Sequence, residues 1–130
     1  MQPHHVGYLV KDIEKAAMEF AKLGYVVVSD VTYDSYRDIN VCFLKNHDLC
    51  IELVAPVSES SVVFSLSKKL GATPYHICYS VKDMEKEART LRERGYVPMG
   101  QAMPAPALGN ALAAFYFCQG VGIIELICPN

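Results

Sequence analysis

The sequence lacks the features that mark membrane-spanning and secreted proteins. No run approaches the roughly 18 consecutive apolar residues of a spanning helix, and the N-terminus, MQPHHVGYLVKD, has no signal-peptide pattern. Five cysteines are present, an odd number without a Cys-x-x-Cys pair, and each lies in an apolar run typical of a β-strand. We therefore expect a soluble, cytoplasmic protein whose cysteines are reduced core residues rather than a disulfide framework.

A large excess of charge of either sign is also missing. The formal net charge is −2, with 12 basic and 14 acidic residues. This balance gives no electrostatic basis for binding nucleic acid or an anionic membrane. The chain has 130 residues, of which 52% are hydrophobic, and this is enough for one domain with a packed core.

What the sequence does contain is an internal duplication. Residues 5–26 and 76–97 are identical at eleven of twenty-two positions, and they can be aligned without a gap. A second match follows in the same order, because IELVAP at 51–56 corresponds to IELICP at 124–129. Two matches in one order predict two equivalent structural modules.

Each module is predicted to have the element order βαβββ. The modules span approximately 4–56 and 75–130, and the linker at 57–74 contains a short helix capped by Ser60 or Ser61. After the first strand and the helix, each module continues with three strands. These are expected at about 25–32, 38–45 and 48–55 in the first half, and at 96–101, 111–118 and 121–128 in the second.

Capping residues define the helix of each module. Asp12 and Asp83 precede the helices and are good N-caps, and Gly24 and Gly95 are expected at the C′ positions that end them. The segment MPAPALGN at 103–110 contains two prolines and a glycine, which predicts an irregular loop.

Alternation in the first strand of each module determines the direction of one histidine. Val6, Tyr8 and Val10 must pack on the helix of their own module. His5 alternates with them and therefore points to the opposite face of the sheet, and the same reasoning applies to His76 in the second module.

A glutamate lies in the middle of an apolar strand in each half, Glu52 in LCIELVA and Glu125 in VGIIELIC. A lone buried charge costs several kcal/mol, so each carboxylate needs a partner. If a pseudo-twofold axis relates the modules, the two histidines and the two glutamates converge on one point. Such a set, with open positions for water or substrate, suits one divalent ion of zinc, nickel, cobalt, manganese or iron. The predicted metal ligands are His5, Glu52, His76 and Glu125.

These motifs resemble those of the vicinal oxygen chelate superfamily, also called the glyoxalase/bleomycin-resistance fold. The stretches HHVGYLVKDIEKA, IELVAP, TPYHICYSVKDMEK and GIIELI are similar to its four ligand-bearing strands, and the likeness spans nearly the whole chain. The resemblance implies an α+β fold in which tandem βαβββ modules form a cup-shaped mixed sheet around one metal ion. It also implies the same four ligands.

Within the superfamily, the sequence is most similar to methylmalonyl-CoA epimerases and is also similar to lactoylglutathione lyase (glyoxalase I). The resemblance implies a metal-dependent isomerase or lyase that removes a proton next to a carbonyl through a metal-stabilised enediolate. Glu125 or Glu52 would be the catalytic base. The substrate would be a small molecule, a thioester or thiol conjugate, and the protein would be a homodimer.

Two alternatives remain at this stage. Epimerases often have glutamine in place of Glu52, whereas glyoxalase I enzymes have glutamate, so lactoylglutathione lyase activity is the first alternative. A non-catalytic protein that binds a small molecule or antibiotic is the second, although such proteins usually lose ligands of the set. The site could be formed within one chain or between two, since both arrangements occur in the superfamily.

Arg37, His4 and His47 are further candidates for the site. Arg37 precedes the strand expected at 38–45, and we predict that it contacts a carboxylate or phosphate of the substrate. The alternative is a solvated arginine without a role in binding. His4 points to the face opposite His5, and His47 lies in a polar turn, so neither is included among the ligands.

Overall fold

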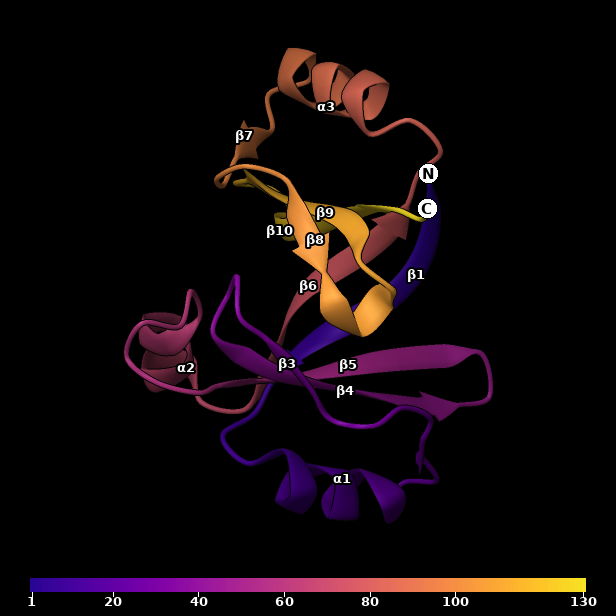
Figure 1. Ribbon diagram of the computed structural model, residues 1–130, viewed down its shortest axis with the longest axis vertical. Coiled ribbons are helices and arrows are strands. Elements are labelled where there is room, and N and C mark those ends of the chain that lie inside the picture. Colours follow the sequence, from indigo (N-terminus) through magenta and orange to yellow (C-terminus); the bar gives the residue numbers. More distant parts are fainter. The chain divides into compact units, whose positions relative to one another are not determined.

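Each repeat of the sequence folds in the predicted element order, except that the strand expected directly after the helix is divided into two short strands, as the computed structural model of residues 1–130 shows (Figure 1). The chain forms two compact units, His5–Tyr75 and Met1–His4 with His76–Asn130. Both contain strands that run parallel and antiparallel, so the α+β fold with tandem βαβββ modules is confirmed. No helix is long and apolar enough to cross a membrane.

The first repeat has the strand order β2-β4-β5-β1, with β3 paired to β4. Strands β1 and β5 are parallel, and the other pairs are antiparallel. A parallel pair requires a long crossover connection, which begins with α1 directly after β1. The elements are β1 (Gln2–Leu9), α1 (Ile13–Ala21), β2 (Val26–Val27), β3 (Thr32–Asp34), β4 (Ile39–Asn46) and β5 (Leu49–Pro56), followed by α2 (Phe64–Leu70).

The second repeat has the corresponding order β7-β9-β10-β6, with β8 paired to β9. Here β6 and β10 are the parallel pair, as β1 and β5 are in the first repeat. The elements are β6 (Thr73–Ser80), α3 (Met84–Glu93), β7 (Val97–Pro98), β8 (Met103–Ala105), the 3₁₀ helix η1 (Pro106–Leu108), β9 (Ala111–Cys118) and β10 (Gly122–Cys128).

The two main helices cover one face of their own sheets. Tyr8 and Val10 pack with Ile13 of α1 in one apolar cluster, and Tyr79 packs with Leu91 of α3 in the other. The residues that alternate with these apolar side chains must point to the other face of each sheet. The sheet faces therefore separate an apolar helix-covered side from the side that carries the predicted ligands.

Aspartates cap both helices at their N-termini, as predicted. The Asp12 carboxylate accepts a hydrogen bond from the backbone N–H of Lys15 at 3.1 Å, and Asp83 accepts one from Lys86 at 3.0 Å. Each bond satisfies one of the N–H groups that the first turn of a helix leaves without an intrahelical partner.

Replacement of Asp83 by alanine is expected to lower the free energy of unfolding by about 1 kcal/mol, because α3 loses the acceptor at its first turn. Urea unfolding of the wild type and the variant measures this difference. Asp48→Ala is the matched control, because Asp48 is exposed in the turn between β4 and β5 and caps no helix. Equal losses in the two variants would contradict a role for the cap.

The helix C-termini differ by one residue between the repeats. In α3 the C-cap is Arg94, and Gly95 follows it with φ 91°, as the prediction of a C′ glycine requires. In α1 the C-cap is Lys22, so Gly24, with φ 97°, lies one position beyond C′. The intervening Leu23 extends the turn by donating its N–H to the carbonyl of Phe20 at 2.9 Å.

The strand expected at 25–32 is wrong in extent, because the structure has β2 and the separate β3 in its place. Val28 still donates its backbone N–H to the carbonyl of Phe43 at 2.9 Å. The next bond is made by a side chain, since the Ser29 hydroxyl accepts from the N–H of Phe43 at 2.9 Å. Because a side-chain oxygen replaces a backbone carbonyl as the acceptor, the regular backbone hydrogen bonding with β4 ends here, and the two short strands are separate.

The second half shows the same division. The strand expected at 96–101 is reduced to β7 and is followed by Gly100, whose φ of 93° interrupts an extended backbone. The loop predicted at 103–110 contains β8 and η1, so it is more regular than its prolines indicated. Gly109, with φ 64°, and Asn110, with φ 63°, then turn the chain into β9.

The linker helix α2 begins later than its predicted serine caps. The Ser60 hydroxyl donates instead to the carboxylate of Asp38 at 2.8 Å. The Ser61 hydroxyl accepts from the backbone N–H of Val63 at 3.3 Å, before the helix begins. Val63 occupies the N-cap position without a side-chain hydrogen bond.

Candidate metal centre

The first module brings His5 and Glu52 together on neighbouring parallel strands. In the pairing of β1 with β5, Gly7 lies directly beside Glu52, and His5 precedes Gly7 by two positions on the same face. The imidazole and the carboxylate are therefore diagonal neighbours, with 3.6 Å between His5 Nε2 and Glu52 Oε1. The two residues are only 3% and 7% exposed.

The second module repeats this arrangement with His76 and Glu125. In the pairing of β6 with β10, Cys78 lies directly beside Glu125, and His76 precedes Cys78 by two positions. The distance from His76 Nε2 to Glu125 Oε1 is 3.2 Å, and the residues are 3% and 4% exposed. Strand register alone thus creates the same buried histidine–glutamate pair in each repeat.

A phenylalanine accompanies each pair and was not predicted from the sequence. Phe43 lies directly opposite Glu52 between β4 and β5, and its ring meets that of His5 at 5.3 Å with an interplanar angle of 80°. Phe115 lies opposite Glu125 between β9 and β10, and its ring meets that of His76 at 5.3 Å and 84°. Both contacts are edge-to-face.

The turn lengths explain why the sequence comparison missed these aromatics. In the sequence, Phe43 lies one residue closer to Glu52 than Phe115 lies to Glu125. The reason is that the turn between β4 and β5 is one residue shorter than the turn between β9 and β10. The two phenylalanines therefore do not align at the offset of either repeated motif. Counting cross-strand partners backwards from the repeated glutamates would have found them.

The spacing within each pair fits two ligands of one cation. A charge-assisted hydrogen bond between nitrogen and carboxylate oxygen is usually about 2.7–2.9 Å long, shorter than either pair. Two donors that each lie about 2.0–2.2 Å from one ion, at tetrahedral or octahedral angles, are about 2.8–3.6 Å apart. The separations of 3.2 and 3.6 Å lie in or at the limit of that range. Nitrogen and carboxylate oxygen also suit the divalent metals named above.

Arg37 is held by a neighbouring carboxylate. It lies in the turn between β3 and β4, where its guanidinium forms an ion pair with the largely buried Asp34 at 2.7 Å. The Arg37 backbone N–H also donates to Asp34 at 3.1 Å. The two contacts fix the direction of the Arg37 side chain.

Three of the five cysteines are small core residues, as predicted, whereas Cys118 and Cys128 are partly exposed. All five are free thiols, and Cys42, Cys50 and Cys78 are buried. Burial raises the pKa of the Cys42 and Cys50 thiols, which disfavours the reactive thiolate.

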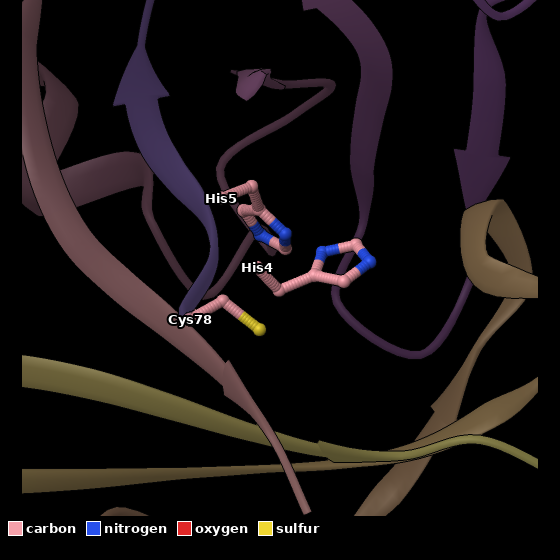
Figure 2. A group of neighbouring side chains, drawn as sticks. All are labelled: His4, His5 and Cys78. Carbon is pink, nitrogen blue, oxygen red and sulfur yellow. The ribbon is translucent and has the colours of Figure 1, made fainter. Parts of the chain in front are cut away.

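His4 and Cys78 form a second small group of donor atoms, drawn with His5 in Figure 2. The nearest ligand atoms of His4 and Cys78 lie within 4.8 Å of each other. His4 is exposed and Cys78 is fully buried. One imidazole and one thiol are too few for a structural zinc site, which uses four protein ligands.

Comparison with known proteins gives the family context. The sequence matches the family model described as glyoxalase/bleomycin resistance protein/dioxygenase superfamily over residues 4–115. An ethylmalonyl-CoA/methylmalonyl-CoA epimerase of Cereibacter sphaeroides is 28% identical over 102 residues, which cover 78% of this chain and 76% of the relative.

Solved structures share the fold over nearly the whole chain. The crystal structure of methylmalonyl-CoA epimerase from Mycobacterium tuberculosis is 25% identical, with a TM-score of 0.85 over 99% of this chain and 88% of that one. A variant of the Streptomyces coelicolor methylmalonyl-CoA epimerase in complex with 2-nitronate-propionyl-CoA is 19% identical, with a TM-score of 0.83 over 99% and 97%. With the family match across most of its length, the chain belongs to the glyoxalase/bleomycin resistance protein/dioxygenase superfamily, as its motifs indicated.

Proposed function

We propose that this protein is a metal-dependent isomerase that epimerises a CoA thioester at its α-carbon, in the manner of the methylmalonyl-CoA epimerases. The observation that carries the proposal is the buried histidine–glutamate pair that recurs in both modules. The identity of 28% to an ethylmalonyl-CoA/methylmalonyl-CoA epimerase supports the substrate class.

The proposed metal ligands are the two pairs taken together. Each pair alone offers two donors, whereas catalytic sites of this kind use three or four protein ligands and leave a position for substrate. The duplication of the chain and the ligand sets of its family support joining the pairs, within one chain or between two copies. A divalent ion held by His5, Glu52, His76 and Glu125 would polarise the thioester carbonyl as a Lewis acid.

Glu125 and Glu52 are the groups proposed to move the proton. Both carboxylates are buried, so few water molecules compete with the substrate for contact with them. One carboxylate, that of Glu125 or Glu52, would leave the metal and take the α-proton from one face of the substrate. The carboxylic acid so formed, or a water molecule that exchanges its proton with it, would return a proton to the opposite face, which restores the carboxylate.

Isotope exchange tests the proposed reaction directly. Incubated with methylmalonyl-CoA in heavy water, the metal-loaded protein is expected to replace the α-proton by deuterium and to invert the α-carbon. Proton NMR measures the exchange, and a chiral assay measures the inversion. A chelator should abolish both, and added cobalt, nickel, manganese, zinc or ferrous iron should restore them.

The same experiment with a second substrate, a glutathione hemithioacetal, tests the glyoxalase alternative. Glu52 favours it, because glyoxalase I enzymes resemble this sequence at that position more than many epimerases do. Isomerisation of a glutathione hemithioacetal without exchange of methylmalonyl-CoA would support lactoylglutathione lyase activity. If the metal-loaded protein converts neither substrate, the catalytic proposal is wrong and a small-molecule or antibiotic-binding role is favoured.

Three further predictions belong to the proposed function. Arg37, which Asp34 orients, is proposed to contact a carboxylate or phosphate of the substrate. A homodimer is expected from the resemblance, and a cytoplasmic location is expected from the sequence. Sedimentation equilibrium of the purified protein measures the first of these, and cell fractionation measures the second.

A further inference from the structure

We propose that Phe43 and Phe115 are positioning residues, each of which holds the imidazole of one module in the orientation that metal binding requires. The proposal rests on the proposed function insofar as His5 and His76 are metal ligands. It assigns to the phenylalanines no contact with substrate or metal. Their effect is transmitted through the histidines.

The ring contacts fix the planes of the imidazoles. An imidazole can rotate about its bond to Cβ, and this rotation carries Nε2 away from a fixed metal position. Phe43 packs almost perpendicular to His5 at 5.3 Å, and Phe115 packs in the same way against His76 at 5.3 Å. Edge-to-face packing at this distance is an attractive geometry with a defined ring orientation.

The strand register places each phenylalanine on the ligand-bearing face. Cys42 and Leu44, the neighbours of Phe43 in β4, pack in the cluster beneath α1. Phe43 alternates with them and points to the other face, where Glu52 is its direct cross-strand partner. Phe115 likewise alternates with Ala114 and Tyr116, which pack in the cluster of the second module, and therefore points to the other face.

The repeat gives an independent reason to assign a role to this contact. The strand sequences around the two phenylalanines, VCFLKN and AAFYFC, have little in common apart from the phenylalanine itself. Nevertheless, both modules have the same aromatic residue opposite the glutamate and against the histidine. A requirement only for bulk at this place would also be met by leucine or isoleucine, which are abundant elsewhere in the strands.

Metal affinity distinguishes a positioning role from a purely structural one. In Phe43→Leu and in Phe115→Leu, the Kd for zinc or cobalt is expected to rise about three- to tenfold, the size of effect that the loss of one aromatic pair produces. Competition titration against a chromophoric chelator measures the Kd. Thermal unfolding of the metal-free variants gives the stability loss for comparison.

Phe20→Leu is the matched control. Phe20 also makes edge-to-face contacts, with Tyr8 at 5.1 Å and with Tyr25 at 5.2 Å, but it lies on the helix-covered side of the first module. This variant should lose a similar amount of thermal stability and keep its Kd for metal within about twofold of the wild type. Unchanged metal affinity in Phe43→Leu and Phe115→Leu, despite lower thermal stability, would overturn the proposal.

A measurement on the metal-free protein separates this inference from the proposed function. NMR coupling constants between the Hβ atoms and the ring atoms of histidine report rotation of the imidazole about its bond to Cβ. In the wild type they should indicate one ring orientation for both His5 and His76. Phe43→Leu should average the couplings of His5 only, and Phe115→Leu those of His76 only. If the wild type binds no metal, the proposed function fails and these couplings alone decide: residue-specific averaging supports positioning, and unchanged couplings reject it.

Discussion

Replacement of Glu125 by glutamine is expected to lower the turnover of the CoA thioester by about 10²–10⁴-fold, the range typical for loss of a general base. Glutamine keeps the size of the side chain and its ability to form hydrogen bonds, but it cannot accept the α-proton. Deuterium exchange at the α-carbon, measured with saturating metal, reports this step directly. Unreactive substrate analogues should still bind, because the change removes a reacting group and leaves the shape of the site.

The matched control for this prediction is Glu85→Gln. Glu85 pairs with Arg89 on the surface of α3, and its side chain is 87% exposed, so its loss should leave turnover unchanged. Glu52→Gln forms a second comparison. It should be milder in an epimerase, where glutamine often occupies this position, and severe in a glyoxalase. Normal exchange rates in Glu125→Gln at full metal loading would show that the base lies elsewhere.

Replacement of His76 by alanine is expected to weaken the binding of a divalent metal by more than about 100-fold. Loss of a group that merely orients a ligand already costs about 10–100-fold in affinity, and this substitution removes the ligand itself. Competition titration measures the effect. His5→Ala should weaken the same binding event to a similar extent, because the two histidines are proposed to hold one ion.

His47→Asn controls for the general effect of losing an imidazole. His47 is exposed in the turn between β4 and β5 and has a φ of 53°, a backbone conformation that asparagine tolerates. Its replacement should leave the Kd for metal unchanged. If His5→Ala and His76→Ala abolish two separate binding events, the joint ligand set is wrong and each pair acts alone.

The residues of each histidine–glutamate pair were predictable because their positions depend on local patterns. Strand alternation alone placed His5 on the face opposite Tyr8, and the apolar neighbours of Glu52 and Glu125 predicted their burial. Asp83 was recognisable as an N-cap for the same reason, since its role depends on residues within one helical turn.

Features that depend on pairing between distant strands were not predictable from the sequence. The phenylalanines meet the histidines only through the registers of three strands, and one extra turn residue hides their equivalence. Ser29 ends the second strand early because its hydroxyl meets the N–H of Phe43. Propensity in the segment 25–32 favours a longer strand, so only the tertiary contact explains the break.

The parallel pairing of β1 with β5 has a consequence for when the proposed metal ion could bind. His5 and Glu52 come from opposite ends of the first repeat, so they meet only when a non-local, slow-forming strand pair has been made. An unfolded or partly folded chain therefore contains no preformed chelating loop for an ion to nucleate. The proposed ion would therefore bind after the sheet has formed, and it would raise the stability of the native state by mass action without accelerating the folding reaction.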